Sequence, residues 1–470
     1  MIKLNFGTLA ENIDGRLLNE EYASALFEGV SIDSRAVTEK QLFVAIKGEK
    51  DDGHNYIGEV LNKGGAGLLI CHEISDLAGI AGKIPVIMVE DTHRAMIQMA
   101  SKYRLTLPGK FIAITGSNGK TTTKEFVYAM IASIENDTYR SPGNLNNLFG
   151  LPLAIFGMEE TMRFGVFELG ISYPGEMTKL AAMARPDLAL ITNVGPTHLE
   201  TLGTVEGVAE AKLELVDAMP ADRPVILNAD SPELMKAARK RRRQYTTYGI
   251  NSKADYMAEI SGLSEEGYPT VKIDGVDVSI KLFGEHQAYN LLAGYAVCRT
   301  LGLAVRPEEL NGIKYNFASY RGEIENVNGM TIIADCYNAN PVSMHSGLKS
   351  FRDYLEHPVM RGRRSVAVIG DMLELGKRTA EFHREAGAFA AEMNFDTVIA
   401  VGPLSRDLYR GAIQSGFDEK RIVHFDDLVV AGEYLLGRVR RGDVLYFKAS
   451  RGIGLEKLIT LLKGSAFRQN

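Results

Sequence analysis

A glycine-bearing segment that follows an apolar run at residues 111–115 has the residue types that bind a nucleoside triphosphate. The segment reads Gly116, Ser117, Asn118, Gly119, Lys120, Thr121 and Thr122. Glycines let backbone N–H groups turn towards phosphate oxygens, and the helix that follows adds its dipole. Lys120 can neutralise the β- and γ-phosphates of ATP, and the Thr121 hydroxyl can bind Mg²⁺. Kinases, ATPases and ligases share this chemistry, so the phosphate loop alone leaves the reaction open.

Three further residues could take part in such chemistry, although each also has a structural interpretation. Glu168 ends an apolar run, where it can either bind Mg²⁺ at the crevice of an open α/β sheet or cap a helix. His198 could be a core histidine or a metal ligand, and its place after a second apolar run favours the site. Lys212 lies in a helical pattern between Glu210 and Glu214, and the residues alone favour a surface lysine paired with these acids.

These residues belong to a part of the chain in which short apolar runs alternate with amphipathic, helix-like stretches. Such alternation predicts a largely parallel β-sheet covered by helices. Residues 245–283 differ, because their period-two alternation and Gly/Asp turns predict a small antiparallel addition. A helix is expected at residues 285–300. Strands are expected at residues 111–115, 166–169, 188–194 and 224–228, and helices at 121–134 and 205–219.

A second alternating series begins near residue 330 and predicts a separate, doubly wound, Rossmann-like unit. Its strands are expected at residues 331–336, 365–370, 397–402, 421–425 and 444–448. The first hundred or so residues mix strands and helices and form a third unit. The predicted fold class is therefore α/β with three domains, in agreement with roughly 100–200 residues for a usual domain. We expect an N-terminal domain at residues 1–106, a central P-loop ATPase-like domain at 107–316 and a C-terminal domain at 317–470.

The composition is that of an ordinary globular protein. Lysine and arginine number 53 and aspartate and glutamate 59, so the formal net charge is −6 and no general attraction to nucleic acid is expected. Cys71, Cys298 and Cys336 lie far apart, and their odd number excludes a full disulfide framework. No apolar run reaches about 18 residues and the start lacks a signal-peptide pattern, so we expect a cytoplasmic protein without membrane insertion.

The order and spacing of four motifs resemble those of the Mur ligases, a family of ATP-dependent ligases. The motifs are residues 115–123, 168–170, 193–200 and 211–212. The resemblance implies that Thr121 and Glu168 bind one Mg²⁺ and that His198 and Lys212 bind a second. In this family the residue matching Lys212 is carbamylated by CO₂, which turns a cation into an anionic oxygen ligand suited to Mg²⁺. The residues implied to act in catalysis are Lys120, Lys212, His198 and Asn144.

The reaction that the resemblance implies is amide-bond formation in two steps. A substrate carboxylate attacks the γ-phosphate of ATP, and an incoming amine then captures the acyl phosphate as phosphate leaves. Two cations and Lys120 would offset the repulsion between the anionic reactants. Fixing both reactants can contribute roughly 7–11 kcal/mol. Because the acyl phosphate must be shielded from water, closure of the domains is expected.

Further matches to the family extend over nearly the whole chain and indicate which substrates are joined. Residues 31–35, 42–48 and 52–54 resemble the UDP-binding part of the Mur ligases that extend the peptide. The segments that resemble the member joining D-Ala-D-Ala to UDP-MurNAc-tripeptide are residues 141–147, 150–153, 335–341 and 370–376. The Asp-Asn-Pro-Arg motif usual in the enzyme that adds the third residue is not found. We therefore expect these two small-molecule substrates, ATP and Mg²⁺ as cofactors, and a monomeric protein.

The resemblance also implies roles for single residues of the expected cleft. Asn290 is expected to contact the adenine, Arg321 the ATP phosphates and Asp335 the ribose. Tyr337 and Asn338 are expected to line the cleft beside the nucleotide. The residues expected at the substrate are Ser34, Arg35, Asn144 and Asn340, with Asn144 near the transferred phosphate.

Four other interpretations account for parts of this pattern. The Mur ligase that adds the third residue is a close alternative. A folate polyglutamate synthetase lacks the N-terminal UDP-binding unit, and a P-loop kinase would need neither the C-terminal α/β unit nor the helix around Lys212. A non-catalytic nucleotide-binding homologue is disfavoured because the implied catalytic set is intact, namely Lys120, Thr121, Glu168, His198 and Lys212.

Overall fold

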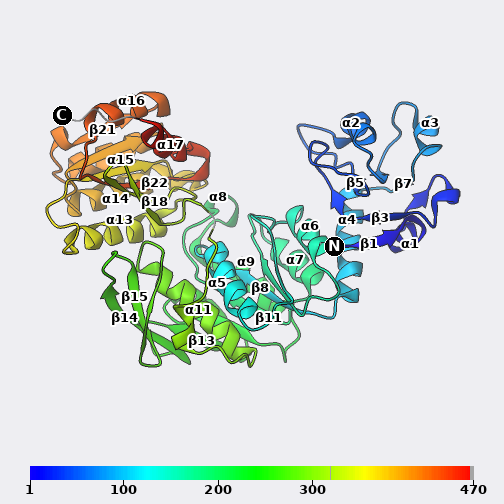
Figure 1. Cartoon of the computed structure of the whole chain (residues 1–470), viewed down its shortest axis with the longest axis horizontal. Helices are drawn as coiled ribbons and strands as arrows, with labels where there is room; N and C mark the ends of the chain where they lie inside the picture. Colours follow the sequence, from blue (N-terminus) through cyan, green and yellow to red (C-terminus); the bar gives the residue numbers. More distant parts are fainter. Residues whose placement is uncertain (318, 466–470) are drawn as a thin grey trace.

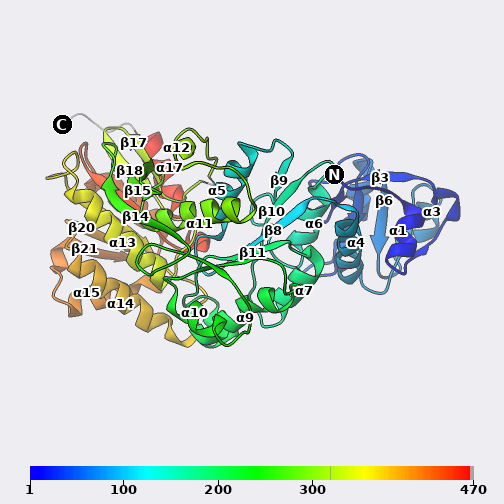
Figure 2. The same ribbon diagram turned by 90° about the horizontal axis from the view of Figure 1, so that it is seen from below.

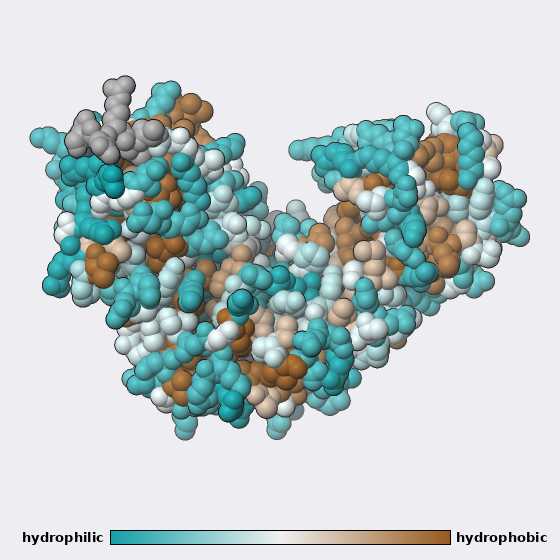
Figure 3. All heavy atoms as spheres, viewed as in Figure 1, coloured by the Kyte–Doolittle hydropathy of each residue, from teal (hydrophilic) through white to brown (hydrophobic). Residues whose placement is uncertain are grey.

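The computed structural model describes residues 1–317 and 319–465 and has three regions, each built around its own β-sheet. The N-terminal region (blue) and the C-terminal region (yellow to red) lie on opposite sides of the central region (Figure 1). The view turned by 90° shows the same order (Figure 2). In the space-filling view, a deep notch separates the N-terminal region from the C-terminal region (Figure 3). The predicted α/β class is confirmed, whereas the exact domain boundaries remain predictions.

The N-terminal region has a short, mostly parallel sheet and four helices. β1 (Lys3–Asn5) and β3 (Leu26–Glu28) pair separately. The order of the main sheet is β2 (Arg16–Leu17), β7 (Val86–Met88), β6 (Gly67–Ile70), β5 (Leu42–Val44) and β4 (Val30–Ser31), with helices α1 (Phe6–Asn12), α2 (Ile57–Asn62), α3 (Leu77–Ala81) and α4 (Thr92–Thr106). Met96 and Met99 of α4 share one apolar core with Phe111 and Phe167 of the central sheet. This shared core anchors the N-terminal region to the central one.

The central region is a nine-stranded sheet. Its order is β16 (Val276–Ser279), β15 (Pro269–Ile273), β14 (Tyr256–Leu263), β13 (Thr246–Gly249), β12 (Val225–Asn228), β11 (Leu188–Ile191), β8 (Lys110–Thr115), β10 (Phe164–Glu168) and β9 (Thr138–Arg140). The strands from β9 to β14 are parallel, and β14, β15 and β16 form the expected antiparallel addition. The prediction is wrong for β13, which continues the parallel sheet, because it pairs in parallel with both β12 and β14.

Helices cover both faces of the central sheet. On one face α5 (Lys120–Ala132) and α11 (His286–Thr300) are packed so closely that a side chain at Gly294 would press on Phe126 and Met130 of α5. The opposite face carries α6 (Gly150–Gly157), α7 (Glu176–Ala184) and α9 (Val205–Asp217). Three short helices are α8 (Leu199–Leu202), α10 (Pro232–Ala238) and α12 (Pro307–Leu310). Since β8, β10 and β11 are parallel, the loops after them emerge at one edge of the sheet, where ligands bind in open α/β folds.

The C-terminal region is a six-stranded sheet between helices. Its order is β17 (Glu323–Val327), β18 (Met330–Ala334), β22 (Val444–Lys448), β19 (Ser365–Gly370), β20 (Thr397–Val401) and β21 (Ile422–Phe425), and its helices are α13 (Pro341–Glu356), α14 (Thr379–Glu392), α15 (Ser405–Gln414), α16 (Leu428–Arg438) and α17 (Glu456–Gly464). The five predicted strands are present and parallel. The antiparallel edge strand β17 was not predicted, because its residues are mostly polar. Among the described residues, no helix has both the length and the apolar character needed to cross a membrane.

Candidate active site

The predicted phosphate loop connects the end of β8 to the first turn of α5. Gly116 and Gly119 have φ angles of +151° and +80°, which favour glycine. A side chain would also overlap Thr192 if placed at Gly116, and Asn290 if placed at Gly119. Both glycines are therefore needed for the shape of the loop. The start of α5 at Lys120 leaves backbone N–H groups without helical partners, and these can bind an anion.

The turn after β11 holds this loop in place. The backbone N–H of Asn118 donates to Oδ1 of Asn193 at 2.9 Å, and the Thr192 hydroxyl donates to the carbonyl of Asn118 at 2.6 Å. The Ser117 hydroxyl accepts a hydrogen bond from the Gly195 N–H at 3.0 Å. Because these bonds lie within the central region, the loop is fixed before a ligand binds.

Glu168 lies beside the loop, at the C-terminal end of β10. Thr121 donates a hydrogen bond to Oε2 of Glu168 at 2.7 Å, and Asn146 donates to Oε1 at 2.8 Å. Arg321, which leads into the C-terminal region, donates to the Thr121 hydroxyl at 3.1 Å. Thr121 and Glu168 thus bring together two oxygen atoms of the kind that Mg²⁺ prefers, and Arg321 adds a positive charge next to them.

A cavity of about 290 Å³ lies between the phosphate loop and the C-terminal region. Asp335, just after β18, accepts hydrogen bonds at Oδ2 from Lys448 at 2.7 Å and from Tyr446 at 2.9 Å. The Arg321 guanidinium lies 3.7 Å from the centre of the Tyr337 ring. The predicted residues that line this cavity are Ser117, Asn118, Gly119, Lys120, Thr121, Thr122, Asn144, Glu168, Asn290, Arg321, Asp335, Tyr337 and Asn338.

A second cavity, of about 260 Å³, adjoins the first and shares Lys120 with it. His198 and Asn340, two further predicted residues, line this second cavity. Nδ1 of His198 lies 2.8 Å from Oε2 of Glu374, and Asn340 exchanges side-chain hydrogen bonds with Asn118 at 2.5 and 3.4 Å. Both contacts join the central region to the C-terminal region, so the second cavity exists only while these regions touch.

Lys212, on α9, is buried, with 1% of its surface exposed. The surface position favoured by its acidic neighbours in the sequence is therefore wrong. Burial, together with the positive charge of Lys120, lowers the pKa of Lys212 well below its usual range. Burial also lowers the pKa of Lys120, whose ammonium donates to the Gly116 carbonyl at 2.8 Å. A lowered pKa increases the fraction of neutral amine, which is the nucleophilic form of a lysine.

Ser34 and Arg35 lie in the N-terminal region and line neither of these two cavities. Ser34 donates to Glu59 at 2.9 Å. The guanidinium of Arg35 binds both carboxylate oxygens of Asp33, at 2.9 and 2.8 Å, and its side chain is 84% exposed. The structure therefore places these two predicted residues in a different region from the phosphate loop.

The sequence did not single out Lys124, a buried residue on α5. Its ammonium donates to the backbone carbonyls of Ser141 at 2.7 Å and Gly143 at 3.2 Å, and thereby fixes the loop that carries Asn144. The available signal was the charged pair Lys124-Glu125 directly before the apolar part of the helix. The other residues that line the first cavity are Asn146, His286, Gln287, Ser343 and Lys448.

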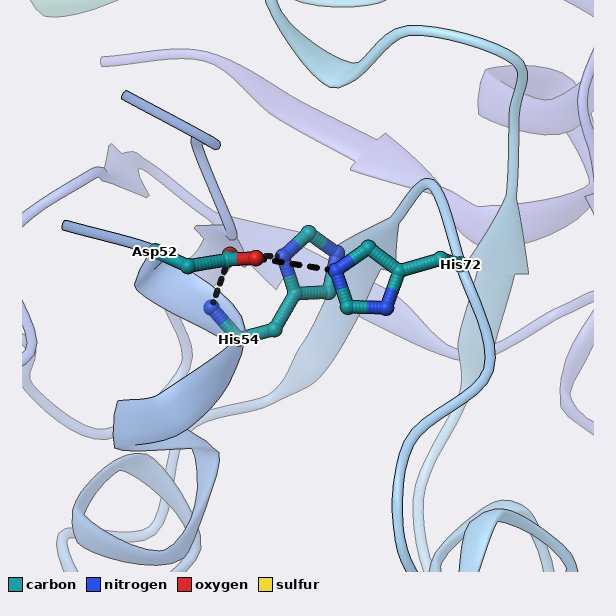
Figure 4. Close-up of side chains that lie close together, drawn as sticks. All are labelled: Asp52, His54 and His72. Atoms are coloured by element: carbon teal, nitrogen blue, oxygen red, sulfur yellow. Dashed lines mark hydrogen bonds and ion pairs between the residues drawn. The ribbon is translucent and has the colours of Figure 1, made fainter. Parts of the chain in front are cut away.

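A separate cluster in the N-terminal region has residue types that could bind a metal (Figure 4). Asp52 bonds to Nδ1 of His54 at 2.6 Å and to Nε2 of His72 at 3.0 Å. The other ring nitrogen of His54 accepts from the Cys71 N–H at 3.0 Å, and that of His72 faces the Glu73 carbonyl at 3.0 Å. Because the Cys71 N–H occupies the lone pair of Nε2, His54 donates its Nδ1–H to Asp52, while both ring nitrogens of His72 face acceptors. The network joins the loops that carry these three residues.

The fold and the larger cavity together define a class of protein. A phosphate loop at the C-terminal edge of a parallel sheet, with a carboxylate beside it and a second α/β region across the cavity, is the arrangement of a nucleotide-binding α/β enzyme. Three family models match the chain: the Mur ligase middle domain at residues 114–298, the Mur ligase glutamate ligase domain at 321–451 and the Mur ligase family catalytic domain at 26–104. The chain belongs to the Mur ligase family.

Individual relatives are similar over almost the full length. The UDP-N-acetylmuramoyl-tripeptide--D-alanyl-D-alanine ligase of Bacillus subtilis (strain 168) is 34% identical over 465 residues, which are 98% of each chain. The crystal structure of MurF from Acinetobacter baumannii is similar with a TM-score of 0.84 and 25% identity, covering 99% of this chain and 100% of that one. MurF ligase from Thermotoga maritima in complex with ADP gives a TM-score of 0.79 and 27% identity, covering 93% and 97%.

Proposed function

We propose that this protein is a cytoplasmic, ATP-dependent ligase that joins D-alanyl-D-alanine to UDP-N-acetylmuramoyl-tripeptide in the synthesis of peptidoglycan precursors. The observation that carries the proposal is the convergence of two regions on one cavity. Lys120, Thr121 and Glu168 come from the central region, and Arg321 and Asp335 come from the chain that enters the C-terminal region. The full-length similarity to ligases of that name supports the same activity.

We propose that residues beside the loop hold two Mg²⁺ ions. Thr121 and Glu168 would hold one ion, and His198 with carbamylated Lys212 would hold the other. Carbamylation is supported by the lowered pKa of Lys212, because a neutral amine is the form that attacks CO₂. When bound, Mg²⁺ would offset the negative charges of the triphosphate and of the attacking carboxylate.

The remaining steps fall to the chain's own groups. Backbone N–H groups of the loop and the Lys120 ammonium would hold the β- and γ-phosphates, with Arg321 on the opposite side. Both hydrogen bonds to Asp335 go to Oδ2, which leaves Oδ1 for a ribose hydroxyl. Asn290 would contact the adenine, and Asn144 would lie near the transferred phosphoryl group.

The UDP end of the substrate would lie in the N-terminal region, near Ser34 and Arg35. Because the phosphate loop belongs to the central region, the substrate would span two regions, with its carboxylate at the nucleotide. Asn340 would line the side from which the amine arrives. Narrowing of the notch between the outer regions would then exclude water from the acyl phosphate.

A substrate panel read by phosphate release tests the proposal. Release should require ATP, Mg²⁺, UDP-MurNAc-tripeptide and D-Ala-D-Ala together, and omission of any one should abolish it. Turnover of a UDP-MurNAc-dipeptide with a free amino acid would identify the related ligase that adds the third residue. ADP binding without release under any combination would instead identify a non-catalytic nucleotide-binding protein. The elution volume in gel filtration would test whether the protein is a monomer, as we predict.

A further inference from the structure

We propose that Glu374 is a positioning residue that orients His198 for the central site, and that it does so only while the C-terminal region is docked. The proposal rests on the proposed function, because it concerns the second metal position assigned to His198 and Lys212. The two side chains of the pair come from different regions. His198 precedes α8, in the turn after β11, and Glu374 follows β19.

The pair lies within a packed contact between the regions and is more than an encounter of two long side chains. Leu199, the neighbour of His198, packs against the apolar core of the C-terminal region. On the other side, a side chain at Gly376 would come within 3.3 Å of the Cα atom of Glu200 in α8. Gly376 begins the short 3₁₀ turn η3 (Gly376–Arg378), which contacts α8. Docking of this turn on α8 therefore places Glu374 next to the imidazole.

The ion pair with Glu374 determines what the imidazole can do. Nδ1 of His198 lies 2.8 Å from Oε2 of Glu374, and within the described part of the chain no other residue bonds to this ring. A carboxylate that holds one ring nitrogen fixes the plane of the ring and leaves the other nitrogen with a free lone pair. The His198 side chain is 29% exposed and lines the same cavity as Lys120. Without Glu374, nothing described in the structure would fix this ring.

The backbone around Glu374 is itself held in an unusual conformation. Glu374 has a φ angle of +62°, a left-handed conformation that non-glycine residues adopt only when their surroundings impose it. The N–H of Met372 donates to Nε2 of His383 at 3.0 Å, and the N–H of Leu373 donates to the Ser450 hydroxyl at 3.0 Å. The C-terminal region thus presents this carboxylate on a fixed turn, although the carboxylate itself is mostly exposed.

The experiment uses the full chain with Mn²⁺ as the probe and the β,γ-imido analogue of ATP. Electron paramagnetic resonance counts bound Mn²⁺, and small-angle X-ray scattering reports how closely the regions dock. Glu374→Ala should weaken the second Mn²⁺ site by roughly 10–100-fold and increase the maximum dimension of the particle. Glu374→Gln should keep most of the affinity, because its amide oxygen can still accept from Nδ1. Glu200→Gln removes an exposed carboxylate from α8 and is the matched control, which should behave like the wild type.

Each outcome decides the proposal. It is overturned if Glu374→Ala matches Glu200→Gln in both measurements, or if Glu374→Gln loses as much affinity as Glu374→Ala. Because the Glu374 side chain is 66% exposed, folding should survive these changes. If Glu374→Ala unfolds at a lower temperature than the wild type, Glu374→Asp can be compared with Glu200→Gln in its place. Its side chain keeps the charge but is shorter, so it should also weaken the second Mn²⁺ site. A wild-type protein that is inactive in the substrate panel but shows these Mn²⁺ and scattering differences would refute the proposed function alone.

Discussion

Replacing Lys212 by methionine separates a chemical role of this residue from a structural one. Methionine has a similar length but no amine, and burial already disfavours the charged form of Lys212. A buried polar group that lacks a partner costs roughly 1–3 kcal/mol. In CO₂-free buffer, Lys212→Met should therefore unfold at the same or a higher urea concentration than the wild type. If the Lys212 amine instead stabilised the fold through a polar contact, its removal would lower the midpoint.

The activity of the same variant should fall steeply. Groups that only orient metal ligands contribute roughly 10–100-fold, so loss of a ligand should cost at least about 100-fold in kcat/KM, equivalent to about 2.7 kcal/mol. Phosphate release measures this loss, and a carbon-13 NMR signal from labelled CO₂ should be present in the wild type and absent in Lys212→Met. Lys212→Ala should be equally inactive but partly rescued by acetate or formate. Full activity of Lys212→Met, or a loss of activity that only parallels a loss of stability, would refute the carbamate.

Three further changes test other parts of the structure. Gly119→Ala should abolish ADP binding in calorimetry, because the new methyl group overlaps Asn290, whereas Gly302→Ala, also at positive φ but in open space, should only lower stability slightly. Lys124→Met removes the donor to the buried Ser141 carbonyl, a loss of roughly 1–3 kcal/mol, and to the part-buried Gly143 carbonyl, so the urea midpoint should fall and KM for ATP should rise. Burial alone would raise the pKa of Asp52, but hydrogen bonds from its two histidines lower it to about 2. The ionised Asp52 carboxylate therefore stabilises the fold above its ordinary pKa of 3.8, and this contribution is lost as the pH falls towards 2. The melting temperatures of the wild type and Asp52→Asn should accordingly differ at pH 7 and converge in acid.

The parts of the site that depend on local sequence could be predicted closely. The strand β8, the phosphate loop and the start of α5 are consecutive, and their glycine spacing and apolar pattern specify a strand, a turn and a helix without help from distant residues. Glu168 could be placed because parallel strands bring their C-terminal ends to one edge. Because β11 is also parallel to β8, the motif around Asn193 and His198 could be placed beside the phosphate loop. The family resemblance added roles to residues whose positions the alternation had already indicated.

The residues that sequence reasoning placed wrongly or did not single out depend on packing between distant segments. Lys212 has an acid on either side in α9, which is the pattern of a surface helix, and only the packing of α9 reveals that it is buried. The ammonium of Lys124 binds carbonyl groups of a loop in the next connection, and backbone carbonyls leave no signature in a sequence. Glu374 contacts His198 only because the C-terminal region docks on the central region. Hydrophobic periodicity cannot predict any of these contacts.

The two halves of the site are held with different strength, and this difference fits a reaction that needs closure. The loop and Thr121 are fixed by short, largely buried hydrogen bonds within the central region. The contacts with the C-terminal region combine apolar packing, such as that of Leu199, with polar contacts. Among the polar ones, the His198–Glu374 pair is partly exposed, and pairs of that kind stabilise by only about 0–1 kcal/mol each. Binding of nucleotide and metal across the cavity can therefore shift the docking equilibrium, because a weakly favoured contact needs little differential affinity to move. The rigid half would hold the triphosphate, and bound substrates would hold the C-terminal half of the site more firmly in its docked position.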